Sequence, residues 1–111
     1  MRTAPVGLAA VHAVLPGPEA CASAIGNDGV DVVSSPWLVG LLEEASHRLV
    51  RDLFEPGEGS VGVRLDLFHR AAALPGREVT AHARLAAVEG RKLRFEVAAF
   101  QGAVRLMDGV H

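Results

Sequence analysis

Two adjacent glutamates, Glu43 and Glu44, lie in a stretch where leucines recur every three or four residues. Such spacing predicts an amphipathic helix, along which each residue is rotated by about 100° from the last. Glu44 then lies opposite the apolar stripe near Arg48 and Arg51, where an i,i+4 ion pair in water accounts for it. Glu43 lies at the margin of the stripe, where desolvation raises the pKa of a carboxyl group and suits a base or nucleophile. Glu43 is therefore a candidate catalytic residue, and the alternative is a boundary glutamate whose carboxylate reaches solvent.

A histidine, His69, stands where the sequence pattern calls for an apolar residue. Residues of alternating character precede it, and the apolar ones are Val61, Val63, Leu65 and Leu67. Period-two alternation predicts a strand with these side chains on the face that meets the helix. His69 continues that face, so its imidazole is a candidate acid, base or electrophile aimed at the helix. The alternative is a strand-end histidine bonded to a carbonyl group.

Ser35 is the third candidate, at the start of the predicted helix. It follows Ser34 and precedes Pro36, and a serine before a proline is a typical helix start, so a capping role accounts for it. The amide groups of a helix N-terminus can also stabilise an oxyanion, which gives Ser35 a possible site role. The sequence contains no Gly-x-Ser-x-Gly motif, so a serine-hydrolase mechanism has no support.

Metal and disulfide chemistry have little support. His47 follows Glu43 by one helical turn, but no third ligand accompanies this pair. Cys21 is the only cysteine, which excludes an internal disulfide and a cysteine zinc site. We therefore expect no metal and no cofactor.

The elements that must position these residues can be read from the pattern. The helix begins near Ser35, ends near Leu53 and is followed by Pro56-Gly57. One strand precedes it and four alternating strands follow, separated by short turns that indicate antiparallel hairpins. The expected strands cover residues 6–15, 61–70, 79–87, 93–99 and 103–107.

This order predicts an α+β fold in which an antiparallel sheet of about five strands wraps around one long helix, the hot-dog fold. We expect residues 1–111 to form a single domain. A lone sheet with one helix leaves an edge strand unpaired, which favours a dimer.

Composition excludes several classes of protein. Half of the residues are hydrophobic and 22% are charged, which rules out disorder. The net charge of −2 provides no basic surface for nucleic acid. No apolar run approaches the roughly 20 residues of a membrane span, and the N-terminus is a poor signal peptide. We expect a cytoplasmic protein without nucleic-acid or membrane partners.

Longer stretches of the sequence resemble the fluoroacetyl-CoA thioesterase family of hot-dog proteins. The similarity runs in continuous register from about Val32 to Gly102. The stretches that carry it are Val39–Glu43, Leu53–Gly62, His69–Gly76, Val88–Leu93 and Phe95–Val97.

The resemblance implies a catalytic set of a Thr or Ser at the helix start, a Glu on the helix and a His at the end of the second strand. These fall on Ser35, Glu43 and His69, and Gly62 matches a glycine at which the backbone approaches the substrate. The family also implies a homodimer with sites near the subunit interface.

We therefore expect an acyl-CoA thioesterase that hydrolyses a small acyl thioester without a cofactor. The phosphates of coenzyme A would meet Arg64, Arg70 or Arg105, and the sequence does not choose among them. The alternative is a non-catalytic hot-dog protein that binds an acyl thioester or a small hydrophobic ligand. A hydratase of related fold is a third reading, but its Asp/His motif is absent.

Two departures from the family bear on specificity. Ser35 replaces the threonine of the fluoroacetyl-specific enzyme, which keeps the hydroxyl and loses a methyl group. The loop at residues 26–31 contains none of the phenylalanines that close over the acyl group in that enzyme. We expect little preference for fluoroacetyl-CoA over acetyl-CoA.

Overall fold

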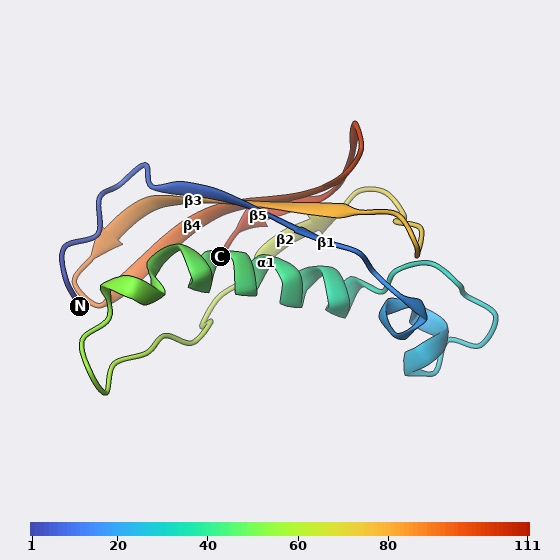
Figure 1. The fold of residues 1–111 in the computed structure, drawn as a ribbon, viewed down its shortest axis with the longest axis horizontal. Helices are drawn as coiled ribbons and strands as arrows, with labels where there is room; N and C mark the ends of the chain where they lie inside the picture. The colour runs from blue at the N-terminus through green and yellow to red at the C-terminus, as the bar shows by residue number, and fades with distance from the viewer.

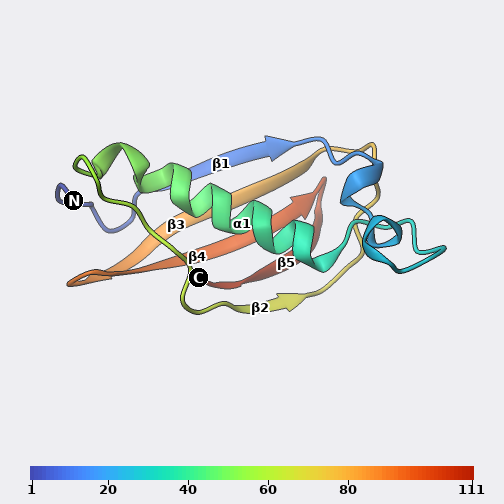
Figure 2. The same cartoon turned by 90° about the horizontal axis from the view of Figure 1, so that it is seen from below.

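A single helix lies across one face of a five-stranded antiparallel sheet (Figures 1 and 2) in a computed structural model that describes residues 1–111. The strand order is β1-β3-β4-β5-β2, which confirms the predicted hot-dog fold. The elements are β1 (Ala9–Val14), η1 (Pro18–Ala20), η2 (Ala22–Ile25), α1 (Ser35–Val50), η3 (Arg51–Leu53), β2 (Asp66–His69), β3 (Val79–Glu89), β4 (Lys92–Gln101) and β5 (Val104–Val110). No helix of this structure has the length and apolar character of a membrane span.

The core lies between α1 and the centre of the sheet. Leu38 and Leu42 on the helix are fully buried, and each leucine buried in this way contributes about 1.5–3 kcal/mol. Beneath them the sheet presents small side chains, since Ala81, Ala83 and Ala99 are buried on the face toward the helix. We refer to these three residues as the alanine floor. Small side chains at a close-packed interface let the helix lie near the strands.

The three C-terminal strands form two consecutive hairpins, as the alternation predicted. The turn between β3 and β4 contains Gly90 with a φ of 62°, a left-handed conformation that glycine adopts without strain. Irregularities in register at Leu85/Ala87 and at Ala99/Phe100 interrupt the ladders. Bulges of this kind bend a strand and increase its twist, so they curve the sheet around the helix.

The predicted strand at residues 61–70 is much shorter in the structure, and its predicted inner face is wrong at Val61 and Val63, although Leu67 packs against the core. Strand β2 begins only at Asp66, while Val61 and Val63 are 85% and 86% exposed. The ladder between β2 and β5 ends at the pair Asp66–Val110, so the preceding residues have no neighbouring strand. The alternating pattern is present, but nothing in this chain pairs with that segment.

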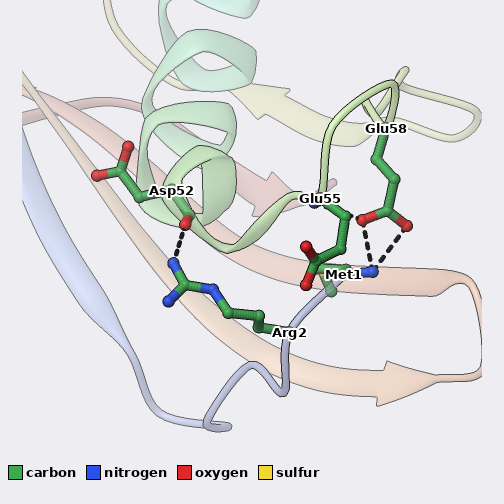
Figure 3. A network of polar contacts seen from close by, with 5 residues as sticks. All are labelled: Met1, Arg2, Asp52, Glu55 and Glu58. Atoms are coloured by element: carbon green, nitrogen blue, oxygen red, sulfur yellow. Dashed lines mark hydrogen bonds and ion pairs between the residues drawn. The ribbon is translucent and has the colours of Figure 1, made fainter.

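The N-terminal segment is tied to the loop that follows α1 (Figure 3). The Met1 ammonium donates to Glu58 Oε2 at 2.7 Å, and Arg2 bonds to the carbonyl group of Asp52. The Met1 ammonium holds the pKa of Glu58 below its ordinary value, and a hydrogen bond from the Glu55 N–H acts in the same direction. This network fixes the loop through which the chain returns from the helix toward β2.

Candidate functional site

Ser35 and His69 meet at the start of the helix. Ser35 is the first residue of α1 and His69 is the last residue of β2, and the Ser35 Oγ lies 2.7 Å from the His69 Nδ1. Both side chains are exposed in the single chain. The fold therefore forms a hydroxyl–imidazole pair from residues 34 positions apart, at the end of an edge strand.

The helix cap is not the residue that the sequence indicated. Ser34 is the N-cap, because its backbone is extended (φ −74°, ψ 151°) and its Oγ accepts from the Trp37 N–H at 3.2 Å. The prediction that Ser35 caps the helix is wrong by one residue, since the helix begins at Ser35 itself and Pro36 follows within its first turn. Ser34 is buried, and the Ser35 hydroxyl is free of the capping duty and bonds to His69.

The same arrangement determines which amides the helix N-terminus can offer. Pro36 has no N–H, the Trp37 N–H bonds to the Ser34 side chain, and the Leu38 N–H bonds to the Ser34 carbonyl group. The Ser35 N–H is therefore the first-turn amide that lies outside this capping set. It belongs to the residue whose hydroxyl contacts His69, so two hydrogen-bonding groups of one residue are placed together.

The two glutamates differ as their angular positions predicted. Glu44 is 54% exposed and lies 3.4 Å from the Arg48 Nε, which is the expected pair on the solvent side of the helix. Glu43 is 39% exposed and lies near Gly62, because a Cβ added at that glycine would approach the Glu43 Oε2 to 2.8 Å. The chain thus passes close to the Glu43 carboxylate, and a larger residue at position 62 would have to displace that side chain.

Sequence reasoning missed a residue at this place, His111. Its Nε2 lies 3.9 Å from the Glu43 Oε2, and its ring stacks on Phe95 at a centroid distance of 5.9 Å. Burial lowers the pKa of His111 from its ordinary value of 6.5, and the Glu43 carboxylate partly offsets this effect. The signal that could have found it is the hairpin register, because Phe95 exchanges both backbone hydrogen bonds with His111 and therefore shares its face of the sheet.

The candidate residues form two groups along the helix. Ser35 pairs with His69 at its start, and Glu43 lies with Gly62 and His111 two turns later, about 12 Å further along the axis at 1.5 Å per residue. A hollow of about 280 Å³ beside His69 is also lined by Val32 and Ala71–Ala72, but not by Glu43. In the single chain the two groups are neighbours on one helix and do not line this hollow together.

Two of the three arginines considered for coenzyme A are already paired. The Arg70 Nε donates to the Asp108 Oδ2 at 2.7 Å, and Arg105 reaches the same oxygen at 3.0 Å. The Arg70 guanidinium holds the pKa of Asp108 below its ordinary value of 3.8 and has its own pKa raised by that contact. Arg64 is exposed and takes part in none of these ion pairs.

The sequence of this chain is similar to a known protein family. A family model described as fluoroacetyl-CoA-specific thioesterase matches residues 17–111. A fluoroacetyl-CoA thioesterase from Streptantibioticus cattleyicolor is 41% identical over 81 residues, which cover 73% of this chain and 58% of that protein. The aligned part of the chain thus spans less than two thirds of the length of this curated relative.

Solved structures agree in fold. The fluoroacetyl-CoA thioesterase FlK matches with a TM-score of 0.94 at 32% identity, over 98% of this chain and 85% of that one. A thioesterase superfamily member from Thermus thermophilus matches with a TM-score of 0.89 at 27% identity, over 99% of this chain and 82% of that one. A hot-dog-like protein from Thermanaerovibrio acidaminovorans shares the fold at 19% identity and a TM-score of 0.85, over 96% and 78% of the two chains.

Proposed function

Because this chain belongs to the fluoroacetyl-CoA-specific thioesterase family, as its sequence resemblance indicated, we propose that it is an acyl-CoA thioesterase that hydrolyses a small acyl thioester. The observation that carries the proposal is the 2.7 Å contact between Ser35 Oγ and His69 Nδ1, with Glu43 further along the same helix. Hydroxyl, imidazole and carboxylate are the groups that thioester hydrolysis needs for orientation and proton transfer.

Glu43 supplies the reactive oxygen or activates it. As a base, the carboxylate takes a proton from water, and the resulting hydroxide attacks the thioester carbonyl carbon. As a nucleophile, it attacks that carbon directly and forms an anhydride that water then cleaves. In both routes the carbon–sulfur bond breaks, coenzyme A leaves as a thiolate that takes up a proton, and neither a metal nor a redox cofactor takes part.

Ser35 and His69 orient the thioester and stabilise its developing charge. A carbonyl oxygen of the substrate near the helix start accepts a hydrogen bond from the Ser35 N–H, because that N–H takes no part in the capping bonds of Ser34. A backbone donor fixed at a helix N-terminus stabilises an oxyanion without reorganising during the reaction. The thioester carbonyl group would then lie between Ser35 and the Glu43 carboxylate, with His69 at its side.

The functional unit is a homodimer formed through the edge of the sheet beside β2. Strand β2 pairs only with β5, and the exposed valines Val61 and Val63 continue from it with an alternating pattern. Phe68 on β2 is also 62% exposed. An unpaired strand edge with apolar side chains favours pairing with another chain, and a second copy there would enclose Ser35, His69 and Gly62 from the open side.

The phosphates of coenzyme A bind near Arg64, because Arg70 and Arg105 already share Asp108. A guanidinium outside ion pairs keeps its donors available for bidentate contact with phosphate. The protein acts in the cytoplasm, which the single free thiol of Cys21 supports.

The second candidate is a protein that binds an acyl thioester without cleaving it. One observation favours it, namely that the hollow beside His69 does not include Glu43. The experiment that separates the two is an assay of free thiol release over a panel of short acyl-CoAs, with binding of the same compounds measured by calorimetry. Turnover that Glu43→Ala abolishes and Glu44→Ala retains supports the thioesterase, and binding without turnover supports the second candidate.

A further inference from the structure

His111 occupies a position that a surface histidine would not. Its side chain is 12% exposed, it stacks on Phe95, and its Nε2 faces the Glu43 carboxylate at 3.9 Å. The other ring nitrogen, Nδ1, is buried and has no hydrogen-bond partner. Since buried polar atoms are normally paired, an imidazole held in this way needs an explanation.

The surroundings of the His111 ring favour one protonation state and one tautomer. Burial lowers the pKa of His111, so the neutral imidazole with one N–H is favoured near neutral pH. The Glu43 carboxylate can only accept a hydrogen bond, so its place near Nε2 favours the tautomer that carries the proton there and leaves the buried Nδ1 a lone pair. Phe95 from β4 and Gly62 from the loop, which border the ring on the other sides, carry no charge.

The backbone at Gly62 lies close to the same two side chains. A Cβ added at Gly62 would lie 2.8 Å from the Glu43 Oε2 and 3.0 Å from the His111 Nε2. The loop thus approaches the ends of both side chains, and both views of the fold show the C-terminus beside the middle of α1 (Figures 1 and 2). A separation of 3.9 Å is too long for a hydrogen bond, but contacts of catalytic groups are often long without substrate and shorten when it binds.

We propose that His111 is a positioning residue, which holds the Glu43 carboxylate in the orientation needed to attack the thioester or to activate water. This inference rests on the proposed thioesterase function. It divides the histidines between two tasks: His69 bonds to Ser35 at the helix start, and His111 orients Glu43 two turns further on.

The test compares three variants. His111→Leu keeps a buried apolar group and removes the N–H, whereas His111→Gln supplies an amide N–H at a similar reach. His82→Leu is the matched control, because His82 contacts an aromatic ring, that of Phe100, from the outer face of the sheet. We expect His111→Leu to lower kcat by roughly tenfold to a hundredfold, as a misplaced reactive group does, with KM nearly unchanged.

Recovery of activity in His111→Gln distinguishes a positioning role of His111 from a packing role. His111→Gln should recover most of the lost kcat, and His82→Leu should retain it throughout, with the melting temperature of each variant recorded. A His111→Leu enzyme with the wild-type kcat would overturn the proposal. So would a loss of activity that follows the melting temperature and that Gln does not restore, because that result indicates only a structural role.

An NMR titration tests the pair without any turnover. We expect the His111 ring signal to titrate below 6.5 in the wild type, and lower still in Glu43→Gln, since the Glu43 charge favours the protonated ring. If the wild type hydrolyses no acyl-CoA, the proposed function is refuted. The titration still shows in that case whether His111 and Glu43 interact. An unchanged His111 titration in Glu43→Gln refutes the pairing even in an active enzyme.

Discussion

Ser34 caps helix α1, and this leaves the hydroxyl of the next residue, Ser35, free to bond to His69. Two adjacent serines therefore have separate tasks, one in folding and one at the candidate site. The division depends on backbone conformation, because Ser34 is extended whereas Ser35 is already helical.

The two serines should respond differently to truncation. Ser34→Ala removes the bond to the Trp37 N–H and should lower the free energy of unfolding by about 1 kcal/mol, as loss of a cap does. A loss of that size lowers the melting temperature by about 4 °C in a domain of this length. Ser35→Ala should leave the melting temperature nearly unchanged and reduce thioesterase activity. Thermal denaturation and free thiol release check both, and a larger loss of stability in Ser35→Ala than in Ser34→Ala would contradict the assignment.

Loss of His69 should affect activity rather than stability. Its side chain is exposed and bonds only to Ser35, so His69→Ala removes little packing. We expect activity to fall by at least about 10²-fold, which is typical when a group that moves protons is removed. His82→Ala, which removes an exposed histidine from the outer face of the sheet, should remain active. A fully active His69→Ala protein would favour the binding function over hydrolysis.

The enzyme should discriminate little between fluoroacetyl-CoA and acetyl-CoA. The loop at residues 26–31 contains no phenylalanine, and most of its residues are exposed, so it provides no aromatic cover for the acyl group. We expect kcat/KM values for fluoroacetyl-CoA and acetyl-CoA to lie within about tenfold, since a small difference in an apolar pocket is worth only about 1–3 kcal/mol. Competition between the two substrates measures the ratio directly, and a ratio of thousands would show that another element provides the discrimination.

The edge beside β2 should control the oligomeric state. We expect the wild type to be a dimer in light scattering. We expect Val63→Lys to shift it toward the monomer, because a charge placed next to the edge strand β2 opposes pairing with another chain. Val11→Lys is the matched control, since Val11 is an exposed valine on β1 at the opposite edge of the sheet. If Val11→Lys dissociates the dimer and Val63→Lys does not, the interface lies at the other edge.

Asp108 should contribute stability that acid removes. Its pKa is held below 3.8 by Arg70, so the folded state is stabilised above that pH and loses the contribution as the pH falls through the folded-state pKa. We expect Asp108→Asn to unfold at lower denaturant concentration than the wild type at neutral pH, with a difference that shrinks below pH 3.8. Glu96→Gln, which breaks the exposed pair with Arg84, should change little at any pH. A difference for Asp108→Asn that persists undiminished in acid would point to a cause other than its charge.

The sequence predicted those parts of the fold that depend on contacts within the chain. The leucine spacing marked α1, and the alternation with short turns marked the hairpins β3–β4 and β4–β5. It was wrong at residues 61–65, because an alternating pattern shows that a segment can form a strand but does not show which strand pairs with it. The helix start was displaced by one residue because Ser34 and Ser35 are chemically equivalent as caps.

The candidate site was predicted in part. The angular difference between Glu43 and Glu44 follows from helix geometry, and the structure shows it. The contact of Ser35 with His69 required the resemblance to a family, because the two residues lie on separate elements. His111 was overlooked, since its position beside Glu43 depends on the register of β5 against β4, which the turn at Gln101–Gly102 determines.

Substitutions in the alanine floor under α1 could change the range of substrates that the protein accepts without altering a reactive group. Ala81 and Ala99 are fully buried beneath the helix, so a larger side chain at either position must push α1 away from the sheet. Such overpacking costs about 1–3 kcal/mol, which a domain with some stability to spare can tolerate. Because α1 carries Glu43 whereas His111 is bonded to the sheet, the helix would move one side of the candidate site relative to the other. Variants that accept longer acyl chains should therefore be sought at positions beneath the helix as well as in the site itself.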